Sequence, residues 1–137
     1  LLNREGEVVI AKRIERGQIK THKAISRSPI AVERLLKIGD DLAAGKAVLL
    51  DVREVDEWND GHLRDARLLP LSRIENGVST QELATVAPQG KIIYLHCAAG
   101  ARSQTAAQLL RSTRRDLRAL PQGYDELLEA GFPQAGR

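Results

Sequence analysis

The residues best suited to chemistry surround Cys97, the only cysteine in the chain. An apolar run at residues 92–95 comes just before it and indicates a strand of a parallel sheet that is covered on both faces. A cysteine at the carboxyl end of such a strand lies where ligands bind in open α/β sheets. Because a thiolate is a good nucleophile, we predict that Cys97 is catalytic and not simply a small buried apolar residue.

The residues that follow Cys97 predict a binding site for an anion. Positions 98–101 hold only Ala and Gly, so their main-chain N–H groups can approach a ligand closely. A helix that begins near position 102 adds its positive N-terminal end. These donors should lower the pKa of the thiol and stabilise an anion beside it. The candidate anion-binding residues are Ala98, Ala99, Gly100, Ala101, Arg102 and Ser103.

A second apolar run, at residues 47–52, contains a carboxylate and is followed directly by a guanidinium. Asp51 and Arg53 both belong to the carboxyl end of this predicted strand, and such groups are seldom buried without partners. They either support the cysteine site directly or form a structural ion pair, and the pattern leaves both interpretations open. We assign His96 to the end of its strand, and His62 to a hydrogen bond with the main chain.

Capping signals and apolar patterns predict that strands alternate with helices. A Ser-Pro pair at positions 28–29 begins a helix that Gly45 ends. We expect Val55 and Trp58 to face inward from a short helix, and Leu109 to belong to the packed face of a later one. Further helices are expected at residues 54–60, after 79–80, at 103–112 and at 124–130, and further strands at 7–12, 24–26, 66–71 and 117–120. This alternation indicates a parallel α/β sheet with helices on both faces.

Length and composition limit the class of protein. A chain of 137 residues fits one domain with a real core. A single cysteine excludes an intrachain disulfide and a metal site built from several cysteines. No apolar run is long enough to cross a membrane and no signal peptide is evident, so we expect a cytoplasmic protein, or a periplasmic one if a leader was removed.

The positive charge is concentrated near the N-terminus. Residues 1–27 contain seven Lys and Arg against three Glu, whereas the rest of the chain is close to neutral. A basic segment can bind nucleic acid or an acidic partner. Because no aromatic residues are interleaved with these charges, we interpret the segment as a solvated extension and do not expect nucleic acid as a partner.

Four motifs in order give the chain a resemblance to single-domain rhodaneses, a family of sulfurtransferases. Leu-Leu-Asp-Val-Arg-Glu at residues 49–54 resembles the first signature of that family, and Glu-Trp with Gly-His-Leu at 57–63 resembles the second. His-Cys-Ala-Ala-Gly-Ala-Arg-Ser at 96–103 is similar to the active-site loop. The segment 123–133 looks like the closing helix and tail. Together the resemblance extends over roughly residues 22–134.

This resemblance implies both a fold and a reaction. The fold is a three-layer α/β/α domain at residues 22–137 with a central, mainly parallel five-stranded sheet, preceded by a basic extension at residues 1–21. In the reaction, Cys97 takes a sulfane sulfur from thiosulfate or a related persulfide donor, and cyanide or a thiol removes it. Arg102 would bind the anionic end of the donor. The resemblance implies no metal and no organic cofactor.

Two other functions fit parts of the same pattern. Cysteine phosphatases and arsenate reductases share the thiolate-in-a-loop design, but a phosphatase resemblance needs five residues between Cys and Arg, and here Arg102 follows Cys97 after four. A sulfur-carrier or regulatory module, which receives its sulfur from one protein and passes it to another, fits the sequence as well as a free-standing enzyme does. Its partner would dock on residues 1–27 or on the arginines at 111–118.

Overall fold

The structure, a computed structural model, describes residues 29–136, and in that part four strands form one parallel sheet. The strands are β1 (Ala47–Asp51), β2 (Ala66–Leu68), β3 (Ile92–His96) and β4 (Asp116–Ala119), in the spatial order β2-β1-β3-β4. All three strand pairs are parallel. The predicted α/β class with a parallel sheet is confirmed. The strands expected at 7–12 and 24–26, the extension and the Ser28 cap lie outside the described residues.

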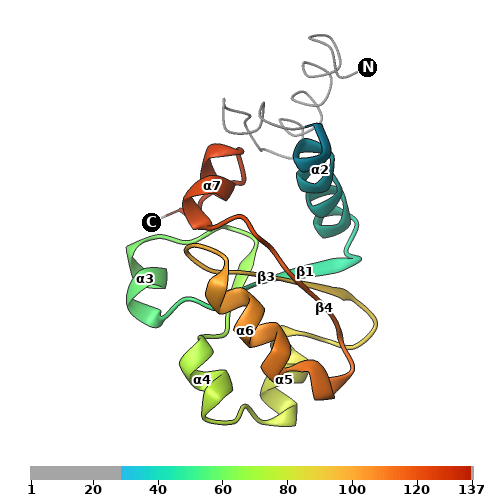
Figure 1. Ribbon diagram of the computed structural model, residues 1–137, viewed down its shortest axis with the longest axis vertical. Helices are drawn as coiled ribbons and strands as arrows, with labels where there is room; N and C mark the ends of the chain where they lie inside the picture. Colours follow the sequence, from blue (N-terminus) through green and yellow to red (C-terminus); the bar gives the residue numbers. More distant parts are fainter. Residues whose placement is uncertain (1–28, 137) are drawn as a thin grey trace.

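Helices cover both faces of this sheet (Figure 1). The helical elements are α2 (Pro29–Ala43), α3 (Val55–Asp60), α4 (Leu71–Glu75), α5 (Thr80–Val86), α6 (Ala101–Leu109), the 3-10 turn η2 (Arg111–Thr113) and α7 (Tyr124–Glu129). In Figure 1, α2 and α7 lie above the sheet, and α4, α5 and α6 lie below it. The layers are therefore helix, sheet, helix, as predicted.

The two central strands separate two apolar cores because successive side chains of a strand point to opposite faces. Leu49 of β1 and Tyr94 of β3 belong to the core under α2 and α7. Leu50 and Leu95 belong to the core that packs against α4, α5 and α6. Cys97 belongs to this second core, on the same side of the sheet as α6. The alternation along β3 thus decides which layer of helices receives the cysteine.

The prediction is wrong for two of the residues that we expected to face inward. Val55 and Leu109 are each 48 % exposed. α3, the short helix between β1 and β2, buries none of its residues. In α6 the inward positions are held by Ser103 and Ala106, which leaves Leu109 on the outside near the helix end. None of the helices in the described region is long and apolar enough to cross a bilayer.

Candidate active site

Cys97 lies one residue beyond the end of the central strand β3. The register pairs Asp51 of β1 with His96, so both strands end at the same edge of the sheet. The carbonyl oxygen of Cys97 accepts a hydrogen bond of 2.9 Å from the amide of Tyr124, which opens α7. Cys97 is a free cysteine and only 1 % exposed. The predicted position of the cysteine at a strand end is what the structure shows.

Main-chain amides surround the sulfur atom. The amide of Gly100 donates to Sγ at 3.0 Å and that of Ser103 at 3.4 Å. Gly100 has φ 96°, in the left-handed region that favours glycine, and this conformation turns its N–H back toward the sulfur. Burial by itself raises the pKa of Cys97, but the amides of Ser103, Ala99 and Gly100 and the Ser103 hydroxyl outweigh it, so the pKa lies below its usual value. The loop therefore favours a thiolate.

The loop presents almost no side chain to solvent apart from Arg102. Ala98, Ala99 and Ala101 are exposed and offer only methyl groups. Ser103 is fully buried, and its hydroxyl donates toward the carbonyl oxygens of Gly100 and Leu120. The structure thus brings all of the candidate loop residues around Cys97, with Ser103 bracing the loop from inside.

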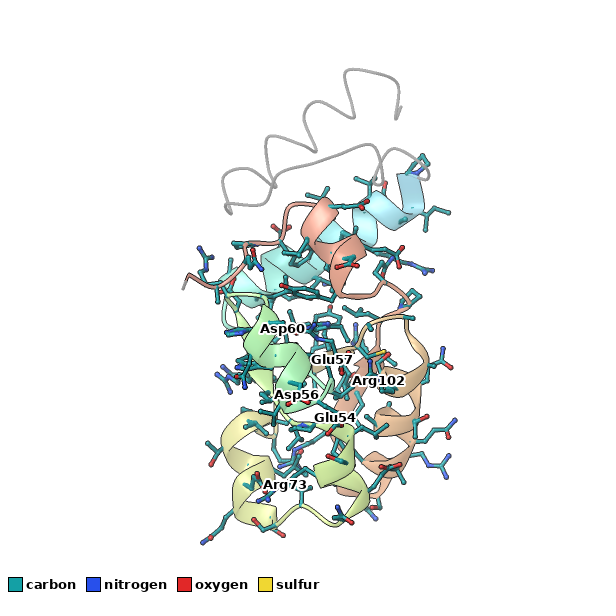
Figure 2. The ribbon with its side chains drawn as sticks, turned by 90° about the vertical axis from the view of Figure 1, so that its left-hand side faces the viewer. Glu54, Asp56, Glu57, Asp60, Arg73 and Arg102 are labelled. Atoms are coloured by element: carbon teal, nitrogen blue, oxygen red, sulfur yellow. The ribbon has the colours of Figure 1, made fainter. Side chains whose placement is uncertain are left out.

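Arg102 is paired with a carboxylate on another element. Its Nη1 and Nη2 donate to the two oxygens of Glu57 at 2.6 and 2.9 Å, and Figure 2 shows the two side chains pointing toward one another from α6 and α3. Oε1 of Glu57 also accepts from the amide of Glu54 at 3.0 Å. The guanidinium of Arg102 is the main reason that the pKa of Glu57 falls to about 2. Sequence reasoning gave Glu57 no role, because nothing local links residues 45 positions apart.

Asp51 and Arg53 form a buried ion pair behind the site. Nε and Nη2 of Arg53 donate to the two oxygens of Asp51 at 3.1 Å or less. Arg53 is 4 % exposed and Asp51 is 0 % exposed. Nη2 also donates to the carbonyl of Gly61 at 2.7 Å, and the guanidinium lies 4.0 Å from the ring centroid of Tyr124. Of the two interpretations left open above, the geometry therefore favours the structural ion pair, which ties β1 to the loop after α3 and to α7.

The two histidines in this region do not bond to the sulfur. His62 Nδ1 lies 3.0 Å from the carbonyl oxygen of Trp58, as predicted, and its ring stacks on that of Trp58. His96 is fully buried, has no hydrogen-bond partner for either ring nitrogen, and lies 3.8 Å from Asp51. Burial is the main reason that the pKa of His96 is lowered. In residues 29–136, no group of three or more His, Cys, Asp or Glu side chains is placed to hold a metal ion.

Gly123 is a second residue of the site that sequence reasoning missed. It caps α7 directly against the loop, where a Cβ atom added to it would lie 1.8 Å from the carbonyl oxygen of Ala98. Its amide donates to Glu126 at 3.1 Å. In the sequence the position stands out only as the first residue of the segment that resembles the closing helix and tail. Its packing against Ala98 depends on α7 reaching the carboxyl edge of β3.

Fold and site together define a class of protein. A thiolate ringed by main-chain amides at the end of a central parallel strand has the chemistry of a nucleophile, and the amides can stabilise an anionic adduct on it. The model of the rhodanese-like domain matches residues 36–130. The chain belongs to the rhodanese-like domain family.

Similar proteins of known structure include sulfurtransferases. A human single-domain sulfurtransferase, TSTD1, is 27 % identical with a TM-score of 0.58, over 68 % of this chain and 90 % of that one. A rhodanese with anions from E. coli is 22 % identical with a TM-score of 0.51, over 66 % of this chain and 99 % of that one, and it supports the fold alone. The similarity to the human protein, together with the family match, supports a sulfurtransferase type of protein.

A relative in Bacillus subtilis (strain 168), the uncharacterized protein YqhL, is 42 % identical over 66 residues. The match covers 48 % of each protein, so it spans about half the length of that relative.

Proposed function

We propose that the protein transfers sulfane sulfur from thiosulfate or a related persulfide donor to cyanide or a thiol, through a persulfide on Cys97. The observation that carries the proposal is the pair of amides, from Gly100 and Ser103, that donate to Sγ at 3.0 and 3.4 Å. Such donors stabilise a thiolate before the reaction and can stabilise a terminal persulfide sulfur after it. The family and the similarity to a sulfurtransferase support the same reaction class.

The first half-reaction needs only a thiolate and an anion site. The Cys97 thiolate attacks the outer sulfur of thiosulfate, a new S–S bond forms, and the electron pair of the old S–S bond leaves with sulfite. Because sulfite is already a stable anion, no proton has to be delivered to it. Within residues 29–136, the hydrogen bonds to Sγ come from loop amides and none comes from a histidine or a carboxylic acid, which agrees with this requirement.

The second half-reaction returns the enzyme to its starting state. Cyanide or a thiolate attacks the outer persulfide sulfur, and the electron pair of the S–S bond returns to Sγ as the thiolate. Thiocyanate or a new persulfide is the product. A lone reactive thiol with no second cysteine is kept active by a reducing compartment, so the cytoplasm remains the proposed location.

The test is the intact mass of the protein after treatment with a sulfur donor. We expect the wild-type chain to gain one sulfur atom from thiosulfate or from methanethiosulfonate, a related donor with one charge less. Cyanide should remove that atom, and Cys97→Ser should never acquire it. A wild-type protein that stays unmodified with both donors refutes the proposal.

Turnover separates an enzyme from a sulfur carrier. An enzyme releases thiocyanate over many cycles in the presence of donor and cyanide. A carrier forms the Cys97 persulfide but turns over slowly with small acceptors, and a protein partner accelerates it. Hydrolysis of p-nitrophenyl phosphate that depends on Cys97 would instead point to a phosphatase.

A further inference from the structure

Arg102 is the only basic residue between Cys97 and Ser103. Its two terminal nitrogens, which form the fork that grips an oxyanion in bidentate fashion, both donate to Glu57. Both side chains are about one-third exposed, so the pair lies at the edge of the loop and not in the core. The cation that a donor anion would use is therefore already engaged.

Glu57 is held in this position from two sides. Besides the Arg102 fork, the amide of Glu54 donates to it across the first turn of α3. With its pKa at about 2, the carboxylate is charged throughout the range in which a thiolate exists. The pair is thus electrically neutral in sum beside the negative sulfur.

Two other arginines among the described residues on this side also have carboxylate partners. Arg53 also lowers the pKa of Glu57, but it is buried and forms an ion pair with Asp51. Arg73, lower in Figure 2, donates to Glu82 at 2.8 Å. Figure 2 also shows further acidic residues along α3 next to Glu57, namely Glu54, Asp56 and Asp60. Among the described residues labelled on this side, acidic side chains outnumber basic ones, so they repel a doubly charged donor that approaches Cys97.

We propose that Glu57 is a specificity-determining residue that acts through Arg102 and discriminates against doubly charged sulfur donors. It competes with the donor for the guanidinium fork and adds repulsion that grows with the charge of the donor. Glu57 hinders a donor less if the donor carries one negative charge less, or if the group attached to its sulfane sulfur is uncharged. This inference rests on the sulfur transfer proposed above.

Two donors that differ by one charge provide the test. In methanethiosulfonate a methyl group replaces one oxygen of thiosulfate, while the sulfane sulfur and its leaving-group chemistry stay the same. For each donor we would measure the second-order rate constant for loading sulfur onto Cys97, followed by release of sulfite or methanesulfinate. Glu57→Gln should raise the rate-constant ratio of thiosulfate to methanethiosulfonate about tenfold.

Asp56→Asn is the matched control. It removes one negative charge from the neighbouring position of the same helix, and Asp56 makes no hydrogen bond to Arg102. It should change the ratio less than about twofold, because its charge is not on the guanidinium fork. A second measurement needs no variant. In the wild type, added salt should raise the same ratio, since screening weakens repulsion more for the donor with the larger charge.

The outcomes separate the two proposals. If neither donor loads sulfur onto the wild type or onto Glu57→Gln, the sulfur-transfer function itself fails. If both donors load sulfur but Glu57→Gln leaves the ratio unchanged or lowers it, Glu57 only positions Arg102 and the specificity role is refuted. A ratio that falls with salt in the wild type would also refute it, because the site would then attract the dianion.

Discussion

The main chain of Gly123 rests directly against the carbonyl group of Ala98, so the start of α7 forms one wall of the cysteine loop. A Cβ at position 123 would lie 1.8 Å from the oxygen of Ala98 and 2.6 Å from its carbonyl carbon. Both neighbours are main-chain atoms, and the next amide, that of Tyr124, is bonded to the carbonyl of Cys97. No side chain can rotate away to make room for an added methyl group.

Gly123→Ala should therefore displace the loop and slow the reaction. A shift of about 1 Å in a catalytic group costs roughly 100-fold in rate, so we expect sulfur loading of Cys97 to be about 100-fold slower. The measurement is the rate of sulfite release in a single turnover. Gly136→Ala is the control, because nothing lies within 4 Å of a Cβ at that position. A variant at position 123 with the wild-type rate would show that the loop yields without cost.

The pKa of Cys97 should depend on the hydroxyl of Ser103. Burial opposes ionisation of the thiol, and the amides with this hydroxyl reverse the balance, which places the pKa below its usual value. Ser103→Ala removes one of the favourable interactions, so the pKa should rise. Thiolate ultraviolet absorbance followed against pH measures it, with Cys97→Ser as the blank. Identical titration curves for the wild type and Ser103→Ala would contradict this prediction.

The Asp51–Arg53 pair should matter far more for stability than its surface counterpart. Asp51→Asn leaves the buried guanidinium of Arg53 without its counter-ion, and breaking a buried pair in this way costs about 3–5 kcal/mol in free energy of unfolding. Asp116 and Arg118 form a pair with the same spacing, but their side chains are 50 % and 47 % exposed. Asp116→Asn should cost less than about 1 kcal/mol. Urea unfolding at neutral pH compares the two variants, and equal losses would be evidence against a buried ion pair.

The hydroxyl of Tyr94 should lose its proton only at high pH. Burial first, and then the hydrogen bond of 2.9 Å that its hydroxyl donates to Asp41, raise its pKa to about 12. Because the pKa is higher in the folded than in the unfolded state, the neutral phenol contributes stability below pH 10, and this contribution is lost as the pH rises through 12. A pH titration of phenolate absorbance should show a step at high pH. Tyr94→Phe should remove this step, and Tyr124→Phe should retain it. If Tyr124→Phe removed it, the assignment to Tyr94 would be wrong.

Much of the fold could be predicted from short-range signals. The apolar runs before Asp51 and Cys97 predicted β1 and β3, because a strand covered on both faces has to be apolar along its whole length. Ser79 begins α5 as predicted, since its hydroxyl accepts the amide of Glu82 at 3.0 Å. These signals operate within a few residues, so no knowledge of the partner elements was needed. The two wrong predictions, Val55 and Leu109, concern apolar residues that lie on the exposed sides of α3 and α6.

The sequence by itself determined the position of Cys97, the proposed nucleophile, and of the loop that surrounds it. Cys97 follows a buried strand, and the small residues after it curl their amides toward the sulfur, which is a local property of the loop. Contacts between distant segments were decided only by the tertiary structure. The pairing of Arg102 with Glu57 and the packing of Gly123 on Ala98 join residues that are 45 and 25 positions apart. They depend on how α3 and α7 pack at the carboxyl edge of the sheet, and residue types and spacing carry no information about that placement.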